Sequence, residues 1–209
     1  MKVGLYFGTF NPIHVGHLII ANYMTEHADL DQVWVVVSPQ NPLKKKKTLL
    51  ADYHRLALVR AAIEDDPNLT VSDIEFHLPI PSYTSTTLTY LKEKHPENEF
   101  SLIMGEDNLR TFHKWFNHDV ILENHTIFVY PRVLTIQELE AQKEADSKQT
   151  DVKSNDFANH KNVVFCNDAP VMKISSSFVR KAIADGKDVR YLLTEPVHKY
   201  VEEMHFYEK

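Results

Sequence analysis

Glycine is scarce in this chain, which holds 5 glycines in 209 residues. Two common phosphate-binding loops, the GxGxxG loop of dinucleotide-binding dehydrogenases and the GxxxxGK[ST] loop of P-loop NTPases, depend on closely spaced glycines. The glycines of this chain complete neither pattern, because they stand at Gly4, Gly8, Gly16, Gly105 and Gly186. The sequence therefore argues against both of these classes of nucleotide-binding protein.

Cysteine, positive charge and long apolar runs are also in short supply. The single Cys166 cannot form an internal disulfide or a cysteine metal cluster, as is usual in a reducing cytoplasm. A net charge of -6 argues against general nucleic-acid binding, which needs a basic face. No apolar run is long enough to cross a bilayer, and the apolar run at Val3 leaves no room for a signal peptide. We expect a cytoplasmic protein without nucleic-acid or membrane partners.

The length and the 43% apolar content suit a single enzyme domain over residues 1–209. Short apolar runs alternate with segments of helical spacing. Strands are predicted at 3–7, 33–37, 69–74, 100–104, 126–130 and 163–165, and helices after residue 17 and at 53–63 and 86–94. This alternation predicts an α/β fold, a Rossmann-like doubly wound parallel sheet with helices on both faces. In such folds, ligands bind at the carboxyl ends of the strands.

The first strand leads into the segment Gly8-Thr-Phe-Asn-Pro-Ile-His-Val-Gly-His17. Gly8 allows a sharp turn or a close approach to a ligand, and Pro12 delays the helix until after it. His14 and His17 then fall at the helix start, where free N–H groups and the helix dipole favour an anion. Two imidazoles three positions apart can face the same anion, and Gly16 is expected to keep the approach open. The segment predicts a phosphate site.

A second helix start with polar side chains lies near the other end of the sequence. Ser175, Ser176 and Ser177 precede the apolar residues of this helix, so hydroxyls and free backbone donors gather there. Arg180 follows on the first turns, where its fork can engage phosphate oxygens. A serine cap with an exposed arginine is common in helices that have no binding function. This segment therefore indicates a phosphate site only in combination with the N-terminal segment.

These two segments carry a family resemblance. His14-Val-Gly-His17 matches the HxGH signature of a nucleotidyltransferase superfamily, and Ile174-Ser-Ser-Ser-Phe-Val-Arg180 resembles its ISSTxIR signature. Within that superfamily, the chain resembles most the bacterial nicotinate-nucleotide adenylyltransferases. Further segments extend the likeness over almost the whole chain: Pro42-Leu-Lys44, Ser82-Tyr-Thr84, and Gly105-Glu-Asp107 followed by Trp115.

The resemblance implies adenylyl transfer from ATP to nicotinate mononucleotide, with release of pyrophosphate. It implies a catalytic set of His14, His17, Lys44 and Arg180. It implies ATP contacts from Gly8, Thr9, Phe10, His17, Lys44, Gly105, Asp107, Ser175, Ser176 and Arg180, and nicotinate mononucleotide contacts from Thr84, Trp115 and Arg132. Mg²⁺ would accompany ATP through phosphate and water ligands, without a dedicated protein metal site. The C-terminal helical part, about residues 174–209, would complete the ATP site.

Three positions depart from the family pattern. Asn11 stands where many relatives have Asp, and Pro131-Arg132 reverses the Arg-Pro order of many members. Thr86 replaces an acidic residue, which removes a helix-capping carboxylate that threonine replaces only in part. None of these changes touches a predicted catalytic histidine.

Other interpretations stay open at the level of sequence. Lys44 could belong to a solvated lysine run, Asp107 could be an ordinary helix-start charge, and Trp115 could be a core aromatic. The signatures also fit a sister adenylyltransferase acting on nicotinamide mononucleotide or pantetheine phosphate, or a nucleotide-binding regulatory module that has lost catalysis. The polar segment 137–161 is expected to be solvated surface, with a lid over the substrate as the alternative. The sequence leaves a homo-oligomer open.

Overall fold

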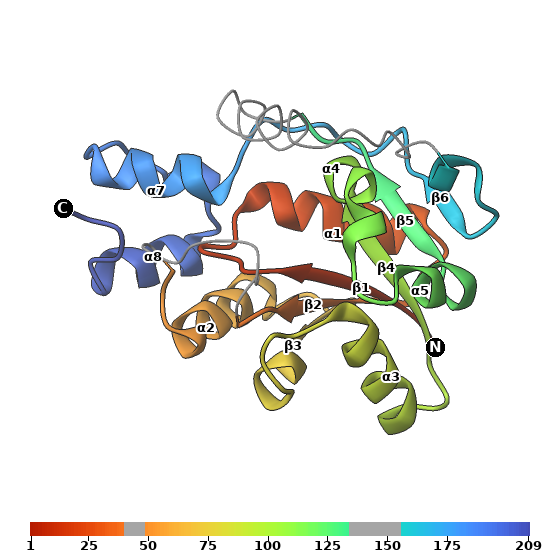
Figure 1. The fold of residues 1–209 in the computed structure, drawn as a ribbon. Coiled ribbons are helices and arrows are strands. Elements are labelled where there is room, and N and C mark those ends of the chain that lie inside the picture. Colours follow the sequence, from red (N-terminus) through yellow and green to blue (C-terminus); the bar gives the residue numbers. More distant parts are fainter. Residues whose placement is uncertain (40–48, 134–155) are drawn as a thin grey trace.

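A parallel sheet forms the centre of the computed structural model, which describes residues 1–39, 49–133 and 156–209. The sheet has the order β3-β2-β1-β4-β5-β6, and every neighbouring pair is parallel (Figure 1). Its strands are β1 (Lys2–Gly8), β2 (Gln32–Val37), β3 (Leu69–Ser72), β4 (Glu99–Gly105), β5 (Ile127–Tyr130) and β6 (Val163–Phe165). The fold class predicted from the sequence is confirmed.

Both faces of the sheet are buried, which explains the continuous apolar runs in the sequence. In β1, Val3 and Leu5 enter one apolar cluster, whereas Tyr6 enters the other. In β2, Val35 lies in the cluster of Tyr6 and Val36 in the opposite one. Successive side chains of a strand point to opposite faces, so a strand buried on both faces needs apolar residues at every position.

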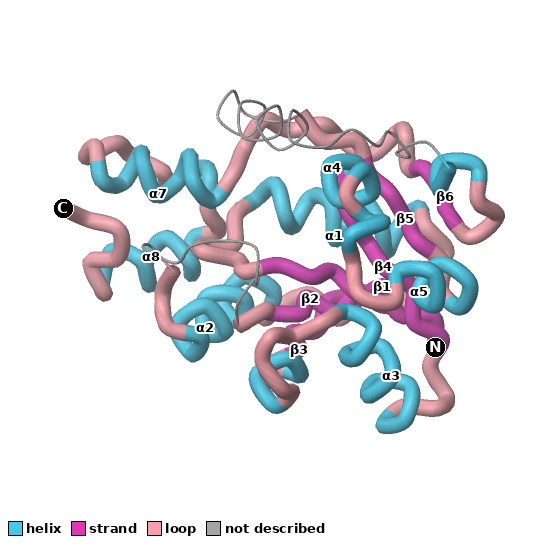
Figure 2. The backbone as a smooth tube through the Cα atoms, viewed as in Figure 1, coloured by secondary structure: helices cyan, strands magenta, loops and turns pink. Residues whose placement is uncertain are grey.

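Helices cover both faces of the strands (Figure 2). Side chains of α1, α2, α7 and α8 share one apolar cluster, and those of α3 and α5 belong to the other. The helices are α1 (Val15–His27), α2 (Asp52–Ile63), α3 (Thr84–Lys94), α4 (Glu106–Arg110), α5 (His118–Asn124), α7 (Ser176–Ala184) and α8 (Glu195–Glu203), with 3-10 turns η1 (Ile74–His77), η2 (Phe112–Lys114), η3 (Asp156–Asn159) and η4 (Arg190–Leu192).

The direction of the strand order reverses at β1. The chain first builds β2 and β3 on one side of β1, and then crosses to build β4, β5 and β6 on the other. The segments that follow β1 and β4 therefore leave adjacent strand ends toward opposite faces, which opens a crevice between them. The C-terminal helices α7 and α8 lie together beyond the carboxyl end of β1 (Figure 1).

Several element boundaries differ from the sequence prediction, among them the start of α3 and the end of β3. Helix α3 begins at Thr84 rather than Thr86, because the N–H of Thr87 donates to the carbonyl of Tyr83 and closes an earlier turn. Strand β3 ends at Ser72, since a 3-10 turn begins two residues later. No helix in the described ranges has the length and apolar character needed to span a membrane. The assignment of residues 1–209 to one domain stays a prediction.

The core on the α3 and α5 face can be tested at Phe112, whose side chain is fully buried. Phe112→Ala should lower the free energy of unfolding by about 3–5 kcal/mol, through lost burial and the cavity left behind. Phe116→Ala is the matched control, because Phe116 is 54% exposed, and it should cost less than about 1 kcal/mol. Urea unfolding measures both changes. Equal losses in the two variants would contradict the assignment of Phe112 to the core.

Candidate active site

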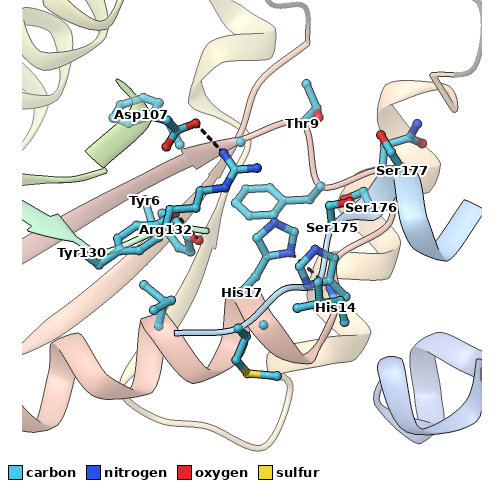
Figure 3. Close-up of a pocket in the computed structure, with 18 of the residues that line it drawn as sticks. Tyr6, Thr9, His14, His17, Asp107, Tyr130, Arg132, Ser175, Ser176 and Ser177 are labelled. Carbon is cyan, nitrogen blue, oxygen red and sulfur yellow. Dashed lines mark hydrogen bonds and ion pairs between the residues drawn. The ribbon is translucent and has the colours of Figure 1, made fainter. Parts of the chain in front are cut away.

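A cleft of about 370 Å³ opens at the carboxyl ends of β1 and β5, and the starts of α1, α4 and α7 contribute residues to it. Figure 3 shows side chains from distant parts of the sequence converging on it. Ten residues predicted from the sequence line this cleft, namely Gly8, Thr9, Phe10, His14, His17, Asp107, Arg132, Ser175, Ser176 and Arg180. The sheet thus brings most of the predicted phosphate-binding residues to the place where its topology opens a crevice.

The turn after β1 is folded around Phe10. This residue has a left-handed backbone, with a φ of 44°, and only 2% of its surface is exposed. A Cβ at Gly8 would lie 2.9 Å from the Phe10 ring, so the ring occupies the space that a side chain there would need. Gly8 is therefore required for packing within the turn, a constraint separate from the close ligand approach that the sequence suggested.

The two signature histidines form a stacked pair at the start of α1 (Figure 3). Their ring centroids are 3.7 Å apart and the planes differ by 19°. The backbone N–H of His14 donates to Nδ1 of His17 at 3.2 Å, which fixes the orientation of the His17 ring. The edges of Phe10 and Tyr6 pack against His17, with ring centroids at 5.0 and 6.2 Å. Both imidazoles are thus held in place before any ligand binds.

Burial keeps both histidines uncharged. Desolvation, with a contribution from the charge of Arg132, lowers the pKa of His14 from 6.5 to about 4. For His17, burial comes first, and the His14 ring and Arg132 add to it, so its pKa lies well below 6.5. Both side chains are therefore neutral imidazoles at pH 7, and each offers one N–H donor.

Gly16, between the two histidines, lines the cleft and also has a packing role that the sequence did not predict. A Cβ at this position would lie 2.4 Å from Cγ2 of Ile174. The space that a side chain at Gly16 would need is therefore filled by the first residue of the C-terminal signature. Absence of a side chain at Gly16 lets the two signature segments touch.

Hydrogen bonds also join the C-terminal signature to the turn before α1. Ser175 caps α7, because its Oγ accepts the N–H of Phe178 at 3.2 Å. The Ser176 hydroxyl donates to the carbonyl of Pro12 at 2.9 Å. Arg180 donates from Nη1 to the carbonyl of Asn11 at 2.7 Å. The starts of α1 and α7 are thereby fixed next to each other, and both present helix N-termini to one cleft.

Asn11 connects this junction to two further segments. Its side-chain oxygen accepts the backbone N–H of Leu50 at 3.1 Å and the hydroxyl of Tyr207 at 2.8 Å. Asn11 stands where many relatives have Asp, and its side-chain oxygen still accepts hydrogen bonds here. The C-terminal end of the described chain therefore supports the turn before the histidines.

Asp107 and Arg132 form an ion pair on the opposite wall of the cleft (Figure 3). Nη1 of Arg132 lies 2.6 Å from Oδ2 of Asp107, and both side chains are partly exposed. A Cβ at Gly105 would lie 2.5 Å from Oδ1 of Asp107, so this glycine leaves room for the carboxylate. Gly105 itself is not among the residues that line the cleft. A residue predicted to bind ATP is thus paired with one predicted to bind the acceptor.

Two tyrosines in the cleft were missed by the sequence analysis. The hydroxyls of Tyr6 and Tyr130 lie 3.2 Å apart, and burial raises the pKa of both phenols. Each follows apolar residues in a strand and resembles an ordinary core aromatic in the sequence. Their positions could have indicated a place in the site, because ligands bind at the carboxyl ends of the strands. Tyr130 ends its strand, and Tyr6 lies two residues before the end of β1.

Besides Gly105, three predicted residues are not placed in the cleft. Thr84 begins α3 and Trp115 follows η2, and neither lines the cleft. Trp115 packs against the apolar cluster that contains Phe112, and the ring centroids of Trp115 and Phe112 lie 5.4 Å apart. Lys44 lies outside the described residues, as do residues 137–155 of the polar segment. Of the three predicted acceptor residues, Arg132 is therefore the one that lines the cleft together with the predicted phosphate-binding residues.

A metal ion finds no preformed cage in the part of the chain that the structure describes. Within these residues, no group of three or more His, Cys, Asp or Glu side chains could hold a metal. A divalent cation at this cleft would therefore take most of its ligands from nucleotide phosphates and water.

Known sequences that resemble this chain are nucleotidyltransferases. The family model described as Cytidylyltransferase-like matches residues 5–182. A protein of Flavobacterium psychrophilum is 54% identical over 209 residues, which is 100% of both chains. A protein of Bacteroides thetaiotaomicron is 41% identical over 203 residues, 97% of this chain and 92% of the relative. Both bear the name probable nicotinate-nucleotide adenylyltransferase.

Comparison with solved structures agrees with the fold. The Plasmodium falciparum nicotinic acid mononucleotide adenylyltransferase complexed with NaAD matches with a TM-score of 0.72 and 17% identity. The match covers 99% of this chain and 97% of that chain. The same parasite enzyme complexed with APC gives a TM-score of 0.71 at 16% identity, over 99% and 96% of the two chains. At such low identity the likeness concerns the fold alone.

The buried histidine pair predicts a pH-dependent stability. The pKa of His14 is about 4 in the folded chain, against the ordinary value of 6.5 that applies to the unfolded chain. Between pH 4 and pH 6.5 the unfolded state therefore binds more protons than the folded state. Stability is then fully present above about pH 6.5 and falls toward pH 4, with a loss from His14 of about 2 kcal/mol at pH 5. Urea unfolding of wild type and His14→Asn at pH 7 and pH 5 should show a smaller pH dependence in the variant.

The matched control for this measurement is His113→Asn, because His113 is exposed. This variant should keep the wild-type difference between pH 7 and pH 5. An unchanged pH dependence in His14→Asn would show that His14 is not held neutral by the fold.

Proposed function

This chain belongs to the nicotinate-nucleotide adenylyltransferases, and we propose that the cleft between the starts of α1 and α7 is its active site. The enzyme transfers the adenylyl group of ATP to nicotinate mononucleotide in NAD biosynthesis. The products are nicotinate adenine dinucleotide and pyrophosphate. One observation supports the location above all others, namely that the two signature segments, far apart in sequence, are bonded to each other at the cleft.

The reaction needs alignment and charge stabilisation more than a nucleophilic side chain. A phosphate oxygen of nicotinate mononucleotide attacks the α-phosphorus of ATP, and the bond from that phosphorus to the pyrophosphate oxygen breaks. Negative charge grows on the pyrophosphate as it leaves. Preorganised N–H and O–H donors that face this charge lower the barrier without reorganising.

We assign the two histidines to this stabilisation. The pair is buried, stacked and neutral, so each ring holds one N–H in a fixed place and can donate it to phosphate oxygens. The free N–H groups at the start of α1 point to the same place and favour the same charge. His14 and His17 would then contact the phosphates as they change charge, which makes them catalytic residues.

Residues of the second signature complete the polyphosphate site in this proposal. Ser175 uses its oxygen as an acceptor in capping α7, which leaves its O–H free to donate. Arg180 holds the turn carbonyl at Asn11 with one nitrogen and contributes positive charge beside the cleft. We assign Ser176 to orientation and Lys44 to neutralising the triphosphate, the latter on the family resemblance. Gly8, Thr9 and Phe10 supply the turn, and Asp107 the far wall.

The nucleotidyltransferases of this family generally use a divalent metal with ATP, and we propose that the metal is Mg²⁺ bound to the substrate ATP. The described residues offer no cage of their own, which fits a metal that arrives with the nucleotide. The cation shields phosphate charge, while the protein donors orient the chain of phosphates.

For the acceptor we propose Thr84, Trp115 and Arg132. Arg132 is supported by its place in the cleft, beside Asp107. Thr84 and Trp115 rest on the family resemblance, in which an indole face meets the electron-poor pyridine ring. We also propose a cytoplasmic location, on the lone cysteine.

The acceptor preference is tested by pyrophosphate release with Mg-ATP and, in parallel, nicotinate mononucleotide, nicotinamide mononucleotide and phosphopantetheine. The expected result is the highest kcat/KM with nicotinate mononucleotide. Turnover with only one of the other two acceptors would move the chain to a sister reaction. Binding of ATP without pyrophosphate release in any of the three assays would favour a regulatory module.

The catalytic assignment is tested by His17→Ala. Removing one preorganised donor should lower kcat by about a hundredfold or more, while circular dichroism and the melting temperature show a folded protein. His27→Ala is the matched control, because His27 ends the same helix α1 and is exposed. Near-native turnover in folded His17→Ala would remove His17 from the catalytic set.

A further inference from the structure

Arg55 on α2 is a charged side chain with no exposed surface, and it is the largest among the fully buried side chains. Arginine is rarely buried in this way unless its donors are satisfied. The proposed reaction does not use it, and the family signatures do not include it. Its surroundings therefore call for a separate explanation.

All five N–H donors of this guanidinium have acceptors. Nε donates to the carbonyl of Leu50 at 3.1 Å, and Nη1 donates to the carbonyls of Thr9 at 2.6 Å and Ser38 at 2.8 Å. Nη2 donates to the carbonyl of Pro39 at 3.4 Å and to the carboxylate of Asp52 at 2.5 Å. Four of the five acceptors are main-chain carbonyls, and the Asp52 carboxylate is the fifth, so Arg55 binds mainly backbone.

Two of these carbonyls belong to segments that border the phosphate cleft, because Thr9 and Leu49, the neighbour of Leu50, both line it. Thr9 lies in the turn after β1, next to Gly8 and Phe10. Ser38 and Pro39 follow β2, and Leu50 precedes α2. Pro39 and Leu50 also stand close to the two ends of residues 40–48, so one side chain holds the backbone on both sides of that stretch.

Further hydrogen bonds join the same backbone segments to the turn between β1 and α1. The N–H of Ser38 donates to the carbonyl of Gly8 at 2.9 Å. The N–H of Leu50 donates to Oδ1 of Asn11 at 3.1 Å. Leu50 is thus fixed through its N–H by the turn and through its carbonyl by Arg55. The guanidinium thus holds the turn through the carbonyl of Thr9 without lining the cleft itself.

Arg55 also stabilises the fold, because an apolar side chain of similar volume would leave four main-chain carbonyls without this donor. Burying a guanidinium is nevertheless costly. The planar fork has a different property, since it fixes the direction and spacing of several acceptors at once. Here those acceptors define how far the turn after β1 stands from the segments after β2 and before α2.

We propose that Arg55 is a positioning residue for ATP binding, which acts by setting the turn at Thr9 against the backbone at Ser38, Pro39 and Leu50. The inference rests on the proposed function, because it assumes that this turn receives the phosphates of ATP. Small errors in such a scaffold matter, since a misplacement of about 1 Å can cost a hundredfold in rate. Thr84 and Trp115, assigned to the acceptor, are not among the five hydrogen-bond partners of the Arg55 guanidinium.

The first test is Arg55→Lys, which keeps the charge but replaces five fixed donors by three on one atom. In the steady-state assay, kcat/KM for ATP should fall about a hundredfold, and the KM for nicotinate mononucleotide should change by less than about threefold. Arg60→Lys makes the same exchange at an exposed position of the same helix and should match wild type. Folded Arg55→Lys with wild-type kcat/KM for ATP would overturn the proposal.

The second test covers an Arg55 variant that folds poorly. Arg55→Ala is refolded with and without methylguanidine, and ATP binding is measured by calorimetry. Restored ATP affinity together with restored folding supports the positioning role. Restored folding without ATP affinity overturns it, as does an Arg55→Ala protein that folds and binds ATP like wild type without the additive.

Wild-type turnover distinguishes this inference from the proposed function. If wild type produces nicotinate adenine dinucleotide and the Arg55 variants behave as wild type, only the positioning role fails. If wild type releases no pyrophosphate with any acceptor, the proposed function fails first, and ATP affinity of the Arg55 variants still decides the positioning role.

Discussion

The contact between the two signature segments is the constraint on which the rest of the site depends. The turn before α1 and the start of α7 are separated by more than half of the chain, yet Ser176 and Arg180 donate to adjacent carbonyls of that turn. At the same junction, the side chain of Ile174 occupies the space that a side chain at Gly16 would need. Two helix N-termini face the same cleft only while this junction holds, so the packing of the fold and the proposed phosphate site depend on the same contacts.

The sheet determines where that junction forms. With β1 between β2 and β4, the strand order reverses at its carboxyl end, and an opening is left there by topology alone. Burial then sets the electrostatics, because the histidines that line the opening lose water on folding and become neutral. Arg55 holds the backbone of the turn after β1 and has no exposed surface itself. Fold, charge state and loop geometry thus follow from one arrangement.

Much of this arrangement could be predicted from local sequence. The apolar runs gave the strands to within about two residues, a usual precision for element boundaries. The spacing of His14 and His17 indicated a shared face, and their stacked rings confirm that expectation. Local patterns do not reveal partners far along the chain. An arginine on a helix resembles a solvated residue, so the buried guanidinium of Arg55 gave no signal, and the partner of Gly16 was equally hidden.

The bond between Tyr207 and Asn11 has a consequence for biosynthesis. These residues are 196 positions apart, so at ordinary elongation rates the ribosome needs about 10 to 40 seconds to pass from one to the other. All six strands of the sheet are synthesised before Tyr207, because β6 ends at Phe165. The hydrogen bond that supports Asn11 can therefore form only after every strand of the sheet has been made.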